Sequence, residues 1–101
     1  MKMFTIVVGE RIEDEVLVLF NDLEIKGYTV ISDVGGSGQT GIVSGTGRWT
    51  DLNKLYLVAL DDDHMARLVN AVRELHNRLV QDHHGLEVPL KVFVQHCELV
   101  V

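Results

Sequence analysis

The feature that most constrains the fold of this chain is the way its hydrophobic period changes along the sequence. Apart from Thr5, residues 3–8 are apolar and form a short run typical of a buried strand. Apolar residues then recur three and four positions apart, as on one face of a helix. Residues 13–15 are acidic and fall in the first turn of that helix, where the helix dipole favours negative charge. Gly27 is expected to end the helical region, and a strand is predicted over 28–34. The helical stripe comprises Ile12, Val16, Leu19, Phe20 and Leu23.

The second half of the chain repeats this alternation. A strand is predicted over 55–60, and the acidic run 61–63 supplies an N-cap and first turn for a second helix. Its stripe comprises Met65, Leu68, Val69, Val72, Leu75 and Leu79. A last strand is predicted over 88–94, with Pro89 near its start, where a missing backbone donor is tolerated. The element order predicts an α+β fold, a ferredoxin-like βαββαβ sandwich with two helices on one face of an antiparallel sheet, and a single domain over 1–101.

The predicted strands are apolar on both faces. In 3–8 and 55–60, apolar residues occupy neighbouring positions rather than alternating with polar ones. Two helices cover only one face of such a sheet, so the other face needs a partner. The chain is 47% hydrophobic, with a mean hydropathy of +0.15, which is high for 101 residues. We therefore expect self-association.

Glycine and polar residues dominate the segment that follows the second strand. Gly35, Gly36, Gly38 and Gly41 give the backbone access to positive φ, and no large apolar side chain anchors the turn. The segment over about 35–51 is longer than an ordinary hairpin connection, and such loops are usually functional or mobile. We expect a mobile loop whose base holds a ligand.

Charge and cysteine content narrow the function classes. The net charge of −6 lacks the basic footprint of a nucleic-acid binder, and it disfavours direct lipid binding. The single cysteine, Cys97, excludes an internal disulfide, and no secretion leader or membrane-spanning stretch is recognised. A cytoplasmic protein is expected.

Three motifs give this chain a resemblance to the PII signal-transduction superfamily. They are the run 27–30 (Gly-Tyr-Thr-Val), the exit 35–41 with its Gln39, and the third strand with its acidic helix start, 54–62. The resemblance implies a homotrimer that binds adenine nucleotides in clefts between subunits. It also implies that 35–51 is a T-loop, the arm with which this family contacts a target transporter or enzyme. The nucleotide-binding candidates it implies are Gly27, Tyr28, Thr29, Gly35, Gly36, Ser37, Gly38, Gln39 and Lys91.

The chain also departs from the family pattern. It lacks the T-loop tyrosine, the glycine- and lysine-rich phosphate loop before the last strand, and the C-terminal arginines that grip polyphosphate. ADP or AMP is therefore favoured over ATP, and the second effector stays open among 2-oxoglutarate, bicarbonate and another anion. Candidates for partner contact are Thr40, Gly41, Ser44, Thr46, Arg48 and Trp49, with packing of the loop root as the alternative role of Trp49.

Metal binding is the competing interpretation. His83, His84 and His96 suggest a CutA-like or PII-like trimer for metal tolerance, but the sequence has no HxH, HxxxH or CxxC spacing. His96 and Cys97 are adjacent on an extended strand and point to opposite faces, so they are poor joint ligands. No metal is expected.

Catalysis has little support in the sequence. The acidic groups 13–15 and 61–63 lie at helix starts, where the dipole explains them, and no nucleophile has an evident base beside it. We expect a regulator rather than an enzyme.

Overall fold

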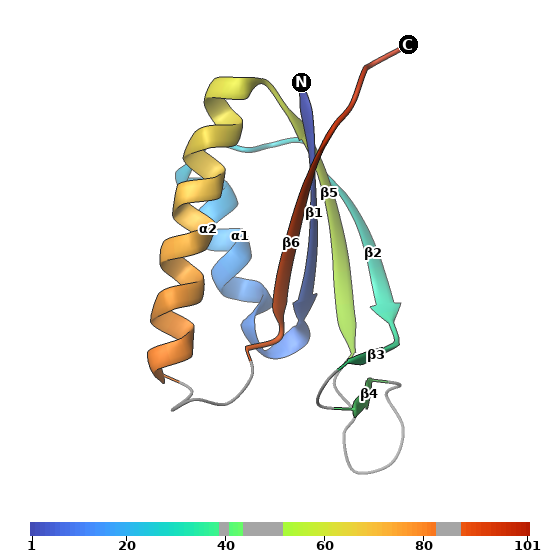
Figure 1. The fold of residues 1–101 in the computed structure, drawn as a ribbon, viewed down its shortest axis with the longest axis vertical. Coiled ribbons are helices and arrows are strands. Elements are labelled where there is room, and N and C mark those ends of the chain that lie inside the picture. The colour runs from blue at the N-terminus through green and yellow to red at the C-terminus, as the bar shows by residue number, and fades with distance from the viewer. Residues whose placement is uncertain (39–40, 44–51, 83–87) are drawn as a thin grey trace.

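The computed structural model describes residues 1–38, 41–43, 52–82 and 88–101, and it has the predicted order of elements. Strand β1 (Lys2–Gly9) leads through a short 3-10 turn, η1 (Glu10–Ile12), into helix α1 (Glu13–Asp22) and strand β2 (Thr29–Val34). Strand β5 (Asn53–Leu60), helix α2 (Asp62–Asp82) and strand β6 (Leu90–His96) complete the domain. The sheet has the order β2-β5-β1-β6, and Figure 1 shows both helices on one of its faces. The ferredoxin-like sandwich is confirmed.

All strand pairs of this sheet are antiparallel, and their register decides which side chains meet the helices. Ile6 in β1 lies opposite Tyr56 in β5 and opposite Val92 in β6. Phe4, Ile6 and Val8 point to the helix face and are at most 1% exposed. They belong to one core cluster with the buried residues of η1 and both helices: Ile12, Val16, Phe20, Met65, Leu68, Val72, Leu75 and Leu79. Both predicted helical stripes therefore face the sheet.

The opposite, outer face of the sheet is not covered by any described element. Residues directly opposite each other share a face, so Ile31, Leu55 and Val7 form one row across it, and Leu57, Thr5 and Phe93 form another. The Phe93 side chain is 59% exposed and Ile31 is 47% exposed. Within the described residues, this apolar face lacks a cover, as expected.

The end of α1 differs from the expectation. The helix ends at Asp22, and the chain then reverses through Glu24, which has a φ of 57°. The Glu24 N–H donates to the Asn21 carbonyl oxygen (3.1 Å), and the Ile25 N–H donates to that of Phe20 (2.8 Å). This is a Schellman motif with a glutamate where glycine is usual, so the prediction that Gly27 ends the helix is wrong.

Helix α2 begins as predicted. The Asp61 side chain accepts a hydrogen bond from the His64 backbone N–H (2.8 Å), as an N-cap residue does. That bond, and then the contact with the His64 ring, lower the pKa of Asp61. Among the described helices, none is both long and apolar enough to cross a membrane.

Two local features were not expected from the sequence. Within the predicted loop, β3 (Gly36–Gly38) pairs antiparallel with β4 (Gly41–Val43) to form a small second sheet. The register of β2 on β5 shifts between Ile31 and Val34, and Asp33 in this bulge has a φ of 59°. The positive φ at the end of β2 thus falls on an aspartate.

Candidate functional site

The predicted loop base lies at one end of the main sheet. At this end β1 finishes opposite the start of β5, with Gly9 across from Asn53, and Val34 of β2 also pairs with Asn53. Gly35 and β3 follow directly after β2, at the end of the sheet where β5 begins and β1 finishes (Figure 1). The glycine-rich exit therefore continues from the β2 edge of the sheet.

The nucleotide-binding candidates do not gather in one place within the chain. Thr29 begins β2 and Lys91 lies in β6, and these are the two edge strands of the sheet. Three strand spacings of about 4.8 Å separate these edges, which places the two backbones roughly 14 Å apart. A single small ligand bound by both residues would have to bridge the whole sheet.

Tyr28 and Thr29 lie on different sides of the sheet. The Tyr28 ring contacts Phe20 and Tyr56 at centroid distances of 5.3 and 5.4 Å, on the helix side. Thr29 is opposite Leu57, whose side chain is on the outer face. Tyr28 is thus part of an aromatic cluster that packs α1 on the sheet, which accounts for its presence without a ligand.

Two of the candidate glycines have room for a side chain. A Cβ built on Gly27 or on Gly36 would meet nothing within 4 Å, and neither residue has a positive φ. Gly36 does not use its access to positive φ, because it lies in strand β3. Gly9, in contrast, would place a Cβ 2.9 Å from the Pro89 Cβ, so the single chain requires glycine there.

A polar network that the sequence analysis missed lies beside this end of the sheet. The Lys54 ammonium lies 3.0 Å from Glu13 Oε1, and the Tyr56 hydroxyl donates a hydrogen bond to Glu13 Oε2. The network joins the first residue of α1 to two same-face residues of β5. Its signal in the sequence was the spacing Lys54-Leu55-Tyr56, which places a charged group next to a core tyrosine.

The network fixes the charge state of its members. Burial raises the pKa of Glu13, but the hydrogen bonds from Tyr56 and Lys54 outweigh it, so the pKa lies below its usual value. The hydrogen bond with Glu13 raises the pKa of Lys54, and Glu10 and Asp33 add to the rise. Burial, followed by the hydrogen bond to Glu13, raises the pKa of Tyr56 well above its usual range. The Lys54 charge is therefore balanced by neighbouring carboxylates.

Metal ligands do not cluster in the part of the chain that the structure describes. No group of three or more His, Cys, Asp or Glu residues is placed to hold an ion there. His96 ends β6 and is exposed, and His83 and His84 lie outside the described residues. The described residues also exclude six candidates of the loop: Gln39, Thr40, Ser44, Thr46, Arg48 and Trp49. Gly41 is described and begins β4.

Comparison with solved structures supports the fold. A nitrogen regulatory PII-like protein, CPII from Thiomonas intermedia K12, bound to ADP, AMP and bicarbonate, aligns with a TM-score of 0.72 at 18% identity, over 93% of this chain and 82% of that chain. Its apo form aligns with a TM-score of 0.61 at 17% identity, over 93% and 85%. A putative PII-like signaling protein from Thermus thermophilus aligns with a TM-score of 0.53 at 18% identity, over 93% and 82%.

Sequence comparison assigns the family. No curated protein sequence matches this chain significantly. The model of the family described as nitrogen regulatory protein P-II, however, matches residues 1–101. With the sheet order and the two helices on one face, this match leads to a plain conclusion: the chain belongs to the P-II family.

Proposed function

We propose that this protein is a cytoplasmic homotrimeric regulator that binds ADP or AMP between its subunits and acts on a transporter or enzyme through the segment 35–51. The family to which it belongs is regulatory rather than enzymatic. The related CPII structures hold ADP and AMP, which supports an adenine nucleotide as the effector here.

The observation that carries the proposal is the split of the candidate site between two edges of the sheet. Thr29 lies on the β2 edge and Lys91 on the β6 edge, so a single chain does not gather them around one ligand. When copies associate through their apolar outer faces, the β2 edge of one copy can approach the β6 edge of the next. A nucleotide in that cleft would contact residues of two subunits, and its binding would depend on assembly.

The charges near the loop base favour a nucleotide with few phosphates. Lys54 is paired with Glu13, and Glu10 and Asp33 add negative charge nearby. Of the candidates on described residues, Lys91 is the one that carries a positive side chain. Each additional phosphate needs positive partners, so ADP or AMP fits this site better than ATP. CPII binds bicarbonate, so bicarbonate is the candidate second effector to test first.

Two measurements test the proposal. Light scattering on a size-exclusion column should give three times the chain mass of 11.3 kDa. Calorimetry with AMP, ADP and ATP, each with and without bicarbonate, should give a binding heat for AMP or ADP and a weaker one for ATP. A monomer, or no heat with any of the nucleotides, would contradict the proposal, and titration with divalent copper or nickel would then test metal binding.

A further inference from the structure

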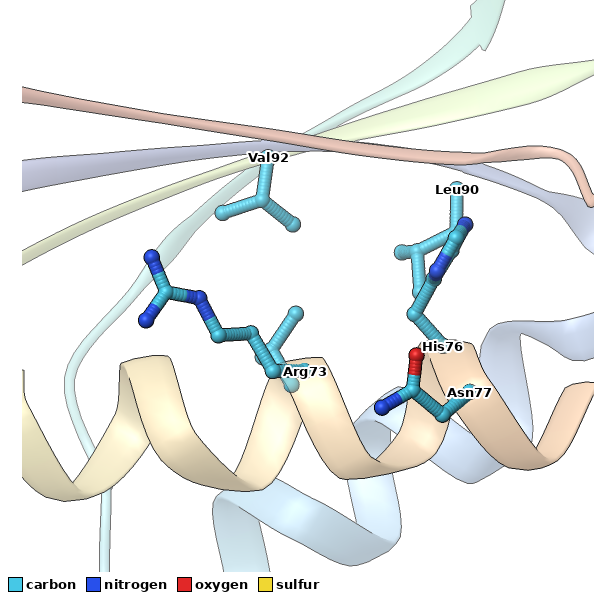
Figure 2. Close-up of a pocket in the computed structure, with 6 residues that line it drawn as sticks. Arg73, His76, Asn77, Leu90 and Val92 are labelled. Carbon is cyan, nitrogen blue, oxygen red and sulfur yellow. The ribbon is translucent and has the colours of Figure 1, made fainter.

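A groove between α2 and β6 lies away from the loop base. Its volume is about 370 Å³, and Figure 2 shows Val92 and Leu90 directed from β6 toward the helix. The groove is lined by Val72, Arg73, His76, Asn77, Leu90 and Val92. Val72 of α2 and the two β6 residues make part of the lining apolar, and the other three α2 residues make the rest polar. The groove is partly open to solvent, which suits an extended segment better than a small molecule that must be enclosed.

The polar part of the groove lining carries a positive charge with no partner in the described parts of the chain. Arg78, two positions after His76, forms an ion pair with Glu15 (3.2 Å), but Arg73 makes no hydrogen bond or ion pair with any described residue. In a chain of net charge −6, a guanidinium beside apolar lining residues favours an acidic and apolar occupant.

Such a segment exists in this chain. Residues 97–101, here called the apolar extension, follow β6 and lead away from the body of the domain (Figure 1). Leu99 is 74% exposed and Val100 is 87% exposed, and Glu98 precedes them. Consecutive exposed aliphatic residues are costly in water unless something covers them.

The apolar extension cannot fill the groove of its own chain. The Cys97 N–H donates to the Met1 carbonyl oxygen (3.3 Å), so the backbone continues in the direction of β6 up to this residue. Val92 lies four residues before His96, or about 13 Å along the strand. After a reversal at residue 98, residues 99–101 of the apolar extension would span at most about 10 Å. They would stop short of Val92 and well short of Leu90.

We propose that the apolar extension of one copy docks in the α2–β6 groove of a second copy. Leu99 and Val100 then cover Val72, Leu90 and Val92, and Glu98 lies near Arg73. The proposal does not require a nucleotide, so a failure to bind one would leave it intact.

Engineered disulfides test this contact in the full chain. In a Cys97→Ser background, Asn77→Cys is combined with Val100→Cys, both at exposed positions. Oxidation should give covalent products of two or more chains that reductant reverses. The matched control replaces Asn77→Cys by Glu74→Cys, one turn earlier and outside the groove lining. Equal yields from both pairs, or monomers alone, whether with free thiols or an internal disulfide, would overturn the proposal.

Charge reversal gives a second test on the same cross-linking pair. Arg73→Glu should lower the yield of covalent product about fivefold, the size expected for a partly exposed ion pair. Adding Glu98→Lys should restore the yield, because the pair is re-formed with opposite signs. Yields that do not respond to Arg73→Glu, or that Glu98→Lys fails to restore, would contradict the assigned register.

Discussion

The two faces of the main sheet differ in how far the described part of the chain covers them. On the helix face, Phe4 is 1% exposed and Ile6 is fully buried, whereas on the outer face Phe93 is 59% exposed. Both faces are apolar, so the difference lies in cover and not in composition. The helix face therefore determines the fold of one chain, and the outer face and sheet edges are the surfaces at which we propose that other molecules bind.

The largest expected effect separates the two faces directly. Phe4→Ala should lower the free energy of unfolding by about 3–5 kcal/mol, since it leaves a cavity in a packed core. Phe93→Ala removes a ring of similar size from the outer face. Its cost should appear as weaker assembly, so the midpoint of urea unfolding should depend on protein concentration more strongly than in the wild type.

Unfolding curves at several protein concentrations distinguish the two cases. For Phe4→Ala the loss should be present in full at every concentration. A Phe93→Ala loss that is independent of concentration would show that the outer face contributes to the stability of the single chain, and the contrast between the faces would fail.

The Glu13 network lies on the covered helix face of the sheet, and its contribution to the free energy of unfolding should depend on pH. Glu13→Gln should lower the free energy of unfolding by about 1–3 kcal/mol near neutral pH, because Lys54 loses its charged partner. The pKa of Glu13 is lower in the folded protein than its ordinary value of 4.5, so the wild-type advantage should be present above pH 4.5 and decline as pH falls through the folded pKa.

Tyr56→Phe is the matched control for that pH dependence. It removes the hydrogen bond that lowers the pKa of Glu13 most, at a cost of about 1 kcal/mol, and keeps the ion pair with Lys54, so the acid dependence should shrink but not vanish. Urea unfolding between pH 3 and 7 measures both variants. A Glu13→Gln difference that stays constant over this range would show that the carboxylate does not act through its charge.

Substitution of Gly36 tests the predicted ligand-binding loop base. A Cβ there meets nothing within 4 Å, so Gly36→Ala should leave the free energy of unfolding within about 0.5 kcal/mol of wild type. If a nucleotide packs against this backbone, its affinity should fall by about tenfold. Calorimetry with ADP measures this change, and unchanged affinity would place the ligand elsewhere.

Gly9→Ala is the contrasting variant for the glycines. Its Cβ would lie 2.9 Å from that of Pro89, so we expect a loss of about 1–3 kcal/mol in stability. Nucleotide affinity per folded molecule should change less than in Gly36→Ala. The two glycines thus distinguish a residue required by the chain from one that only a bound molecule would require.

The hydrophobic period predicted the fold well, because both helical stripes and the core strands depend on burial within one chain. Local features that depend on backbone geometry were harder to predict. Glu24 and Asp33 adopt positive φ although nearby glycines were the obvious candidates. The Glu13 network joins residues 41 and 43 positions apart, and the helix dipole gave a sufficient local reason for the acid. The candidate site stays a prediction, since its residues lie on separate edges of one chain.

The smallest expected effect concerns the C-terminal end of α1, where the turn contains one residue with a left-handed backbone conformation. Glu24 has a φ of 57° and is exposed, so Glu24→Gly should relieve the penalty of a left-handed residue. Glycine also loses more chain entropy on folding, and the net gain should be about 0.5–1 kcal/mol. Glu24→Ala is the control, since it removes the carboxylate but keeps the Cβ, and it should give no such gain. Because the Schellman motif is local, the gain should be the same at every protein concentration and with or without ADP. A gain that varies with either would show that this turn also belongs to a surface that another molecule completes.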